Sequence, residues 1–136
     1  MRLILGAAFG QASPVPTDWP TLYFDAHLEA GAKLPISAET EERAIYVLKG
    51  QLSIAGIDCP EHQMLVLKSG YDATVTANTA CRFMVLGGAT MDGPRYIWWN
   101  FVASSKERIE DAKEQWRARR FPVVAGDSNE FVPLPK

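Results

Sequence analysis

The sequence predicts an all-β fold, an antiparallel β-sandwich or barrel with one C-terminal α-helix. Short β-prone runs separated by Gly, Pro, Asn and Asp recur roughly every 8–12 residues up to about residue 102. The pattern then changes to a period of about 3.6 residues in SSKERIEDAKEQWRARRF. The length of 136 residues suits one hydrophobic core, so we expect a single domain over residues 1–136.

The first two strands are predicted on either side of a proline-rich loop. RLIL begins the chain as a strand, and GQASPVPTDWP is too rich in proline to continue it. TLYFDAHL then alternates, with apolar side chains at every second position from Leu22 to Leu28. One face of this second strand should therefore lie in the core.

Six further strands are predicted in the middle of the chain. They lie in the segments RAIYVLKGQLSIAGI, QMLVLKSGYDATVTA, CRFMVLGG and YIWWNFVA. The first segment is interpreted as a hairpin around Lys49-Gly50, and the second as two strands with a turn at Ser69-Gly70. The last two segments supply one strand each.

The last element is an amphipathic helix that Pro122 ends. Ser104 followed by Glu107 predicts a capping box at its start. One stripe is apolar and should pack against the sheet or a partner; it consists of Ile109, Ala112 and Trp116. We expect the tail after Pro122 to be an extended strap along the surface.

Composition and charge exclude several classes of function. An apolar content of 47% and a charged content of 22% are ordinary for a soluble globular protein. A net charge of −2 gives no electrostatic footprint for nucleic acid, and no run approaches the ~18 apolar residues of a membrane span. The start, MRLILGAAFGQAS, is interpreted as a strand and a loop rather than a secretion signal. Cys59 and Cys81 form no CxxC pair, so we expect free thiols and a cytoplasmic location.

Four segments carry a family resemblance over nearly the whole chain. They are RLILGAAFGQASPVPTDWPTLYFDAHLEAGAKLPI, EERAIYVLKGQLSI, RYIWWNFVASSKERIEDAKEQWRARRFP and EFVPLP. Together they resemble the C-terminal domain of the pirin family, whose members contain two domains of the cupin, or jelly-roll, class. The resemblance implies a cupin β-sandwich here, and a stand-alone or trimmed version of the second pirin domain.

The resemblance also carries expectations about function. In pirins the N-terminal domain holds a metal, usually iron, on three histidines and a glutamate, and the C-terminal domain holds none. Family activities include a quercetin dioxygenase reaction at that metal and regulatory binding to transcription factors or metabolic enzymes. For this chain the resemblance implies no metal and no cofactor.

The ligand positions of the cupin metal motifs support the same expectation. The segment from Gly31 to Gly50 has the spacing of the first motif, and KSGYDA fits the frame of the second. The four ligand positions are occupied by Ser37, Glu39, Arg43 and Ala73. Iron in oxygenases requires two histidines and a carboxylate on one face, and this set does not supply them.

These positions are still candidates for binding, because ligand side chains in a cupin point into the barrel. We expect Ser37, Glu39, Arg43 and Ala73 to line the interior, with Trp98 as a further candidate. Alternation sends Trp98 and Trp99 to opposite faces, and core packing is the main interpretation for them. A small-molecule pocket lined by these aromatic residues is the alternative.

Arg43 raises a question of charge. Alternation places Arg43 on one face with Ile45 and Val47, and an unpaired buried guanidinium is costly. We therefore predict that Arg43 pairs with Glu39 or another acid in the metal's place. In the alternative, the preceding loop turns outward and leaves both charges in water.

Other catalytic patterns are missing from the sequence. It contains neither the G-x-S-x-G elbow of serine hydrolases nor the GxxxxGK loop that binds phosphates. A two-histidine site made by His27 and His62 with Asp25 or Glu61 is conceivable, but nothing in the sequence brings these residues together. We expect surface or hydrogen-bonded histidines.

The sequence thus favours a non-catalytic binding or assembly module. An apolar face that a sister domain would cover favours a homodimer or a partner protein domain. The competing interpretation is an enzyme, either an oxidoreductase like quercetin dioxygenase or a metal-free catalyst with Arg43 as substrate anchor. A third interpretation is a small-molecule sensor whose pocket is the mouth of the barrel.

Overall fold

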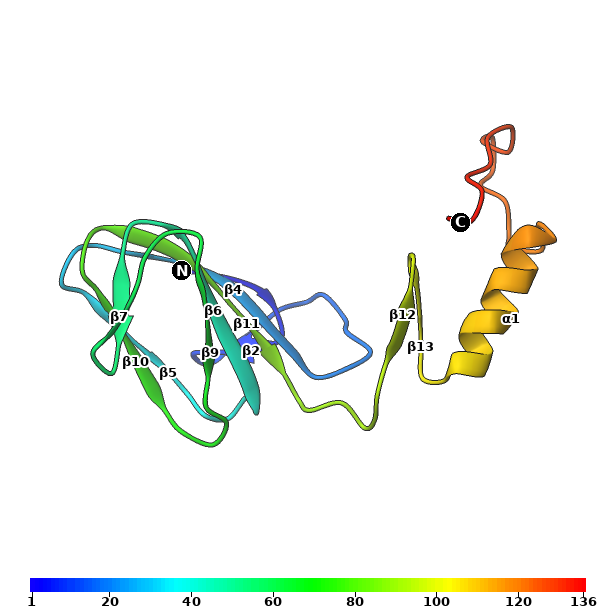
Figure 1. Cartoon of the computed structure of the whole chain (residues 1–136). Coiled ribbons are helices and arrows are strands. Elements are labelled where there is room, and N and C mark those ends of the chain that lie inside the picture. The colour runs from blue at the N-terminus through cyan, green and yellow to red at the C-terminus, as the bar shows by residue number, and fades with distance from the viewer. The chain divides into compact units, whose positions relative to one another are not determined.

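A computed structural model describes residues 1–136, and the chain folds into two compact units, Met1–Thr90 and Met91–Lys136. The first unit is an antiparallel β-sandwich, and the second combines a β-hairpin, a helix and an extended tail (Figure 1). The predicted all-β sandwich with one C-terminal helix is confirmed. That the chain forms a single domain stays a prediction.

Two sheets and a small hairpin make up the first unit. The five-stranded sheet consists, in spatial order, of β1 (Arg2–Leu5), β4 (Thr21–Leu28), β11 (Cys81–Gly88), β6 (Glu42–Lys49) and β9 (Met64–Leu67). The four-stranded sheet consists of β5 (Lys33–Ile36), β10 (Ala73–Ala77), β7 (Leu52–Ile54) and β8 (Ile57–Cys59). The hairpin consists of β2 (Ala7–Ala8) and β3 (Gln11–Ala12).

The core of the sandwich is formed by every second side chain of its strands. Leu22, Phe24 and Ala26 of β4 are buried, as the alternation predicted. Ile45 and Val47 of β6 lie in the same apolar cluster, together with side chains from the four-stranded sheet. Period-2 burial of this kind places one face of each sheet on the core and leaves the other face outside.

The predicted hairpin around Lys49-Gly50 is wrong. β6 and β7 belong to different sheets, so the turn at Gly50 carries the chain from one sheet to the other. Gly50 has a φ of 78°, and a Cβ atom there would clash with the Ala80 carbonyl. The hairpin lies one step later, where β7 pairs with β8 around Ala55-Gly56.

The predicted turn at Ser69-Gly70 is confirmed. This turn also crosses between the sheets, because β9 lies in the five-stranded sheet and β10 in the four-stranded one. The segment between β5 and β6 also crosses between the sheets, and it lies close to the segment between β9 and β10, because the Ala38 backbone N–H donates to the Asp72 carboxylate at 2.7 Å. Arg43, which lies between them, is described below.

The second unit begins with a hairpin where a single strand was predicted. β12 (Tyr96–Trp98) pairs with β13 (Phe101–Ala103), and Trp99-Asn100 forms the turn. Trp99 has a φ of 53°, which is uncommon for a residue other than glycine. Alternation alone does not reveal such a turn, because the residues on either side are strand-prone and Asn100 is the one turn-favouring residue between them.

Helix α1 (Lys106–Arg117) begins one residue later than predicted, so the expected capping box from Ser104 is wrong. Ser105 is the N-cap, and its hydroxyl accepts a hydrogen bond from the Arg108 backbone N–H at 3.3 Å. Glu107 then lies in the first turn, where its own backbone N–H and the Ser105 hydroxyl lower the pKa of its carboxyl.

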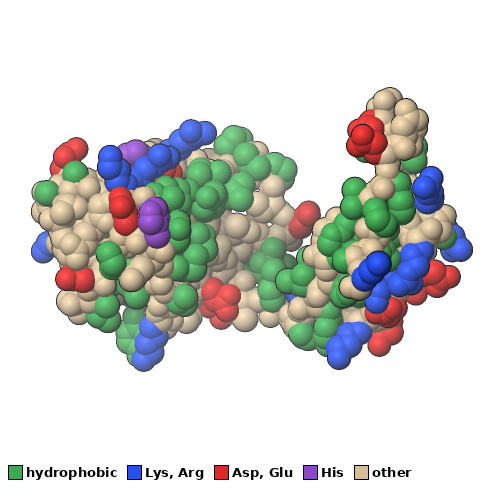
Figure 2. Space-filling model, turned by 45° about the horizontal axis from the view of Figure 1, so that its top comes forward, with side chains coloured by type: hydrophobic (Ala, Val, Ile, Leu, Met, Phe, Trp, Pro, Cys, Tyr) green, Lys and Arg blue, Asp and Glu red, His purple; other side chains and the backbone are tan.

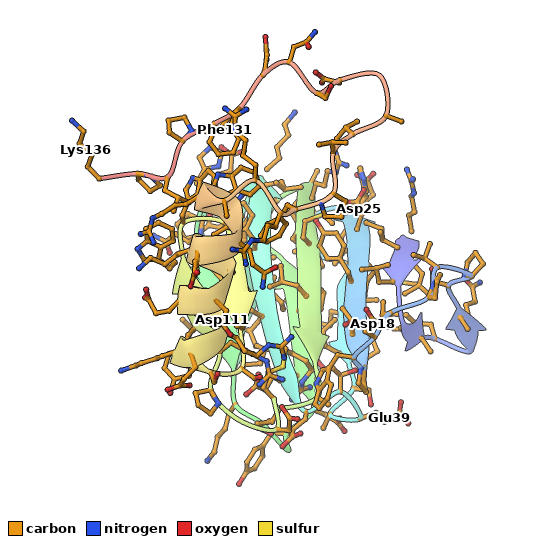
Figure 3. All side chains as sticks on the ribbon, turned by 90° about the vertical axis from the view of Figure 1, so that its right-hand side faces the viewer. Asp18, Asp25, Glu39, Asp111, Phe131 and Lys136 are labelled. Atoms are coloured by element: carbon orange, nitrogen blue, oxygen red, sulfur yellow. The ribbon has the colours of Figure 1, made fainter.

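The apolar stripe of α1 packs on the hairpin. Ile109 is buried, and α1 contacts both β12 and β13. The Trp116 indole N–H donates to the Val132 carbonyl at 2.8 Å, and Phe131 stacks on the Trp116 ring with centroids 5.5 Å apart. Figure 3 shows Phe131 beside the C-terminal end of the helix. The tail is thus held against α1, as the strap prediction requires.

Two general expectations can also be compared with the structure. Cys59 and Cys81 are free, as predicted; both are buried, and burial raises the pKa of both thiols. The cytoplasmic location inferred from them stays a prediction. No helix of the molecule combines the length and the apolar character that crossing a membrane requires.

Candidate binding site

Arg43 is the buried centre of the candidate site. Its side chain is only 2% exposed, which confirms the prediction that it points inward from β6. Its Nη1 donates to the carbonyl oxygens of Ile36 at 3.3 Å and Ser37 at 2.7 Å. Its Nη2 donates to those of Lys68 at 3.1 Å and Tyr71 at 2.8 Å.

The predicted pairing of Arg43 with Glu39 or another acid is wrong. The acceptors of Arg43 are all backbone carbonyls, and it forms no ion pair. Glu39 is exposed, and no hydrogen bond engages its carboxylate. Carbonyl dipoles solvate a guanidinium well because charged donors make stronger hydrogen bonds than neutral ones. The charge is therefore compensated by dipoles rather than by a counter-ion.

These carbonyls come from the two segments that carry the cupin ligand positions. Ile36 and Ser37 stand where β5 ends, and Lys68 and Tyr71 belong to the turn between β9 and β10. One side chain thus ties the two segments together at the end of the sandwich. The Nε of Arg43 is buried without a partner, so the guanidinium has no exposed donor left.

The residues present do not fit the metal that this fold often holds. At the four ligand positions, Ser37 and Glu39 are exposed, Ala73 has no donor atom and Arg43 is a cation. No three His, Cys, Asp or Glu side chains gather anywhere in the molecule. The donor set therefore lacks the two histidines and the carboxylate that iron oxygenases require.

Three of the predicted binding residues do meet at one pocket. Ser37, Glu39 and Ala73 line a cavity of about 580 Å³ beside the β2–β3 hairpin. Its apolar walls come from residues that include Phe9, Phe24 and Ile36. Arg43 is not among the lining residues, since its side chain is turned to the carbonyls described above.

The charged groups of this pocket are carboxylates, beside the hydroxyls of Ser37, Thr40 and Thr74. Glu39 and Asp72 are its charged residues, and no basic side chain lines it. The Asp72 carboxylate accepts the Ala38 backbone N–H at 2.7 Å, which holds the wall near Ser37 in place. The Glu39 carboxylate is the free acceptor of the pocket. In Figure 3, Glu39 lies at one end of the sandwich, beyond the ends of the strands.

Phe9 is a pocket residue that the sequence reasoning missed. It stands at the tip of the β2–β3 hairpin with a φ of 54°, and its ring meets Phe24 edge-on at 5.6 Å. Gly6 and Gly10, which precede and follow it in the sequence, were the available signal, since glycines often mark turns. The structure explains Gly6, because it has a φ of 80° and a Cβ atom there would clash with the Thr21 carbonyl. An aromatic side chain between two turn-forming glycines is consistent with an ordered hairpin tip.

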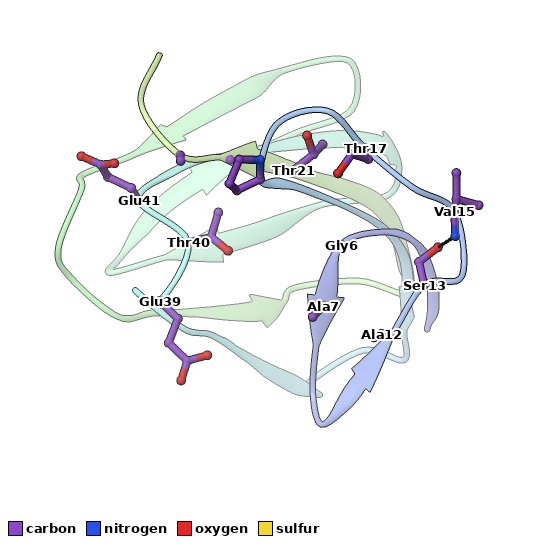
Figure 4. A pocket seen from close by; sticks show the side chains of 13 residues that line it. Gly6, Ala7, Ala12, Ser13, Val15, Thr17, Thr21, Glu39, Thr40 and Glu41 are labelled. Atoms are coloured by element: carbon purple, nitrogen blue, oxygen red, sulfur yellow. Dashed lines mark hydrogen bonds between the residues drawn. The ribbon is translucent and has the colours of Figure 1, made fainter. Parts of the chain in front are cut away.

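A second cavity of about 540 Å³ lies on the other side of the same hairpin. Figure 4 looks into it, with Gly6 and Ala7 on one side and Thr40 and Glu41 on the other. The two cavities share Ala7, Glu39 and Thr40. Glu41 is already engaged, because it accepts the Thr90 backbone N–H at 3.0 Å, and this hydrogen bond lowers the pKa of its carboxyl.

Trp98 is not part of this pocket, contrary to its place among the candidate residues. It lies on β12 in the second unit, where it stacks on Phe101 with centroids 6.2 Å apart. The Lys113 Nζ of α1 lies 4.7 Å from the centre of its ring. Packing under the helix is therefore the role that the structure gives it. Trp98 and Trp99 do not alternate across a strand, since Trp99 lies in the turn.

The predicted surface role of the histidines agrees with the structure. His27 is exposed on β4, with its Nε2 atom 3.5 Å from the Asp25 carboxylate. Arg82 holds the same carboxylate through its Nε at 3.0 Å and its Nη2 at 2.9 Å. These contacts, with Arg82 as the main cause, lower the pKa of the Asp25 carboxyl. Sequence reasoning missed Arg82 because the register of β4 with β11 sets this contact.

Comparisons with known proteins agree with this architecture. The family model described as the pirin C-terminal cupin domain matches residues 23–122. A pirin-like protein of Caulobacter vibrioides is 43% identical over 135 residues, which cover 99% of this chain and 46% of that protein. A Pseudomonas aeruginosa protein with the provisional name quercetin 2,3-dioxygenase is 26% identical, over 98% of this chain and 44% of that protein.

A solved structure supports the fold. The crystal structure of quercetin 2,3-dioxygenase from Acinetobacter baumannii superimposes with a TM-score of 0.82 at 24% identity. The match covers 98% of this chain and 46% of that one. This chain therefore spans about half the length of the curated relatives it matches.

Proposed function

Because this chain belongs to the pirin C-terminal cupin domain family, we propose that it is a non-catalytic cupin domain that acts by binding. The observation that carries the proposal is the guanidinium of Arg43 at a metal-ligand position. Its terminal nitrogens donate to four carbonyls of two segments. The side chain thus joins these segments, and it brings a positive charge where a metal ligand would have to be neutral or anionic.

The pocket beside the β2–β3 hairpin supports a small-molecule ligand. Its volume of about 580 Å³ is within the ordinary range for ligand pockets. Its aromatic and aliphatic walls suit an apolar body. An ionised carboxylate only accepts hydrogen bonds, so Glu39 suits a hydroxyl or ammonium group on that body. The pocket thus favours an apolar, donor-bearing ligand over an anion.

A second candidate function is an oxidoreductase reaction on quercetin. The name of the Pseudomonas aeruginosa relative, which is similar over nearly the whole chain, favours it. An oxygenase of this kind needs a metal, and the ligand positions here do not supply its donors. The version with Arg43 as substrate anchor is less well supported, because both terminal nitrogens are engaged and Nε is buried.

Turnover of quercetin by iron-treated protein separates the two candidates. The chain is purified without a metal-affinity tag, incubated anaerobically with Fe(II), freed of unbound iron and assayed for oxygen-dependent loss of quercetin. We expect no turnover above that of a matched iron solution. Turnover that scales with protein concentration and disappears in Glu39→Gln would contradict the binding proposal and favour the oxygenase.

Ligand binding is tested with a pair of probes of opposite charge. Phenethylamine and phenylacetate have the same aromatic ring, and only the first bears an ammonium group. We expect phenethylamine to raise the melting temperature more than phenylacetate does, and Glu39→Gln to remove that difference. A larger effect of phenylacetate would contradict the predicted ligand chemistry.

A further inference from the structure

The β2–β3 hairpin is a short ribbon that is fixed to the sandwich mainly at its base. Its two strands pair only with each other, as a separate two-stranded sheet. At the base, the Ser13 backbone N–H donates to the Gly6 carbonyl at 2.8 Å, and the Ser13 hydroxyl donates to the Ile4 carbonyl at 2.7 Å. An isolated two-stranded hairpin is only marginally stable in water, so the position of this one depends on its contacts with the sandwich.

Both sides of the hairpin border a cavity. Ala7 lines both the larger cavity of about 580 Å³, which is the proposed ligand pocket, and the smaller cavity of about 540 Å³. Phe9 lines only the larger cavity, and Ala12 lines only the smaller one, which Figure 4 shows beside the hairpin. The hairpin therefore has few packed neighbours along its sides. Segments with few buried contacts open locally at a low cost in free energy.

Phe9 is the one large side chain of the hairpin. The two strands themselves supply three alanines and a glutamine. The Phe9 ring meets the Phe24 ring edge-on with centroids 5.6 Å apart, and Phe24 is a buried residue in the wall of the larger cavity. Edge-on ring pairs are favourable beyond the area that they bury. This ring pair and the packing of Ala8 on the core cluster are thus the contacts that hold the tip.

The backbone of Phe9 is strained. Its φ of 54° lies in the left-handed region, which is unfavourable for a bulky side chain. Figure 2 shows hydrophobic side chains gathered on the surface of the first unit, so the partial exposure of Phe9 alone does not single it out. Its strain does, because strained residues persist where neighbouring contacts fix them and are frequent at ligand clamps and switch segments.

We propose that the β2–β3 hairpin is a lid on the larger cavity, and that the contact of Phe9 with Phe24 keeps this lid closed. The hydrogen bonds of Ser13 keep the base in place, so opening moves the tip away from the sandwich. A ligand enters between the tip and Phe24 while the ring pair is broken. Since both rings line the cavity, a ligand that fills it contacts both and favours the closed lid.

This inference rests on the proposed function, because it concerns access to the same pocket. Opening of the lid is nevertheless a property of the ligand-free chain, and it can be measured without any ligand. A lid that opens on a pocket that binds no amine would contradict only the proposed function. An amine that binds while the hairpin never opens would contradict only the lid.

Thiol labelling with iodoacetamide, followed by mass spectrometry, measures the opening. Ala8 is partly buried against the core cluster, and its neighbour Ala7 is exposed. The thiol of Ala8→Cys is therefore covered while the lid is closed, and the thiol of Ala7→Cys is accessible in both states. The native Cys59 and Cys81 are buried, so their labelling reports unfolding of the whole sandwich.

We expect Phe9→Ala to accelerate the labelling of Ala8→Cys about tenfold, because the ring pair that closes the lid is lost. Labelling of Ala7→Cys, Cys59 and Cys81 should not change. Phe121→Ala is the matched control, since it removes a similarly exposed ring from the second unit, and it should leave the labelling of Ala8→Cys as it was. Phenethylamine should slow the labelling of Ala8→Cys.

Two results would overturn the lid. One is labelling of Ala8→Cys at the same rate with and without Phe9→Ala, which would show that the ring does not hold the hairpin. The other is an equal acceleration at Cys59 and Cys81, which would show that the change loosens the sandwich as a whole. If Phe9→Ala fails to fold, Phe9→Leu replaces it, because it keeps an apolar side chain and loses only the ring pair; we then expect an acceleration of about threefold.

Discussion

The two units of this chain bury their apolar side chains in different ways. In the first unit, β-branched and aromatic residues such as Ile45, Val47 and Phe83 are completely buried between two sheets. In the second unit, Ile109 is the one buried apolar side chain, and it is still 6% exposed. Its aromatic side chains instead meet at their edges and faces around Trp116, which contacts Trp99, Phe101, Phe121 and Phe131.

This difference shows where a buried charge can be accommodated. The dense core of the first unit includes Arg43, because two turns direct four carbonyls at its guanidinium. The second unit keeps its cations at the surface of the aromatic cluster, as with Arg119 over Phe131 at 4.5 Å. Stability in the first unit should therefore depend on complete burial and hydrogen bonding, and in the second unit on partly exposed ring contacts.

The largest effect is expected from Arg43→Met. The change keeps the apolar stem but leaves the carbonyls of two segments without their donor, which should lower the free energy of unfolding by about 3–5 kcal/mol. Chemical denaturation measures the loss. Since Glu39 does not contact Arg43, adding Glu39→Ala should not restore stability. A double variant clearly more stable than Arg43→Met would show that the two charges interact.

Trp116→Ala tests the second unit. A fully buried aromatic side chain costs about 3–5 kcal/mol on truncation, and Trp116 is partly exposed, so we expect about 2–3 kcal/mol. The change also removes the hydrogen bond to Val132 and the stack with Phe131. Hydrogen exchange should therefore accelerate in residues 91–136 more than in the sandwich. Equal acceleration in both units would contradict the distinction between them.

The Asp25–Arg82 pair on the outer face of the sheet should give a smaller, pH-dependent effect. Asp25→Asn is expected to cost about 1 kcal/mol at neutral pH, as is typical of a well-formed surface pair. Arg82 lowers the pKa of Asp25 below its usual 3.8 in the folded chain. This contribution is then complete above the unfolded pKa and is lost as the pH falls through the lower folded pKa. Urea denaturation at a series of pH values should show the parent and the variant converging only in acid.

The smallest effect is expected at the surface of α1. Lys113 bonds Glu110 at 2.8 Å and also lies over the Trp98 ring. Glu110→Ala removes only the exposed ion pair and leaves Lys113 over the Trp98 ring, so it should change the free energy of unfolding by less than about 0.5 kcal/mol. Lys113→Ala removes both contacts and should cost somewhat more, about 1 kcal/mol. Thermal melts of the two variants in the same buffer give the order directly.

The fold was predictable where side-chain periodicity decides it. The alternation of β4 and the apolar stripe of α1 located buried residues, and the alternation of β6 placed Arg43 on the inner face of its sheet. Periodicity says nothing about which strands pair, so the crossing at Gly50 was taken for a hairpin. The turn at Trp99 was hidden for a similar reason, because a positive φ is a property of the backbone that strand-prone side chains do not reveal.

The sequence predicted which residues line the site, but not which groups accept the hydrogen bonds of Arg43. The motif spacing located Ser37, Glu39 and Ala73, and these residues line one pocket. The motif spacing could not show that the backbone carbonyls of Ser37 and Tyr71 point at Arg43, because the direction of a carbonyl depends on the geometry of the turn. The side-chain chemistry alone suggested an acid, which is the usual partner of a buried arginine.

The most direct test of the account is the metal content of the protein after exposure to iron. The parent chain, purified without a tag, is incubated anaerobically with Fe(II), desalted and analysed by inductively coupled plasma mass spectrometry. The account predicts iron well below one ion per chain, no higher than in a variant with Glu39→Ala. One tightly held iron per chain in the parent, reduced in that variant, would contradict the claim that Arg43 occupies a ligand position and leaves no metal site.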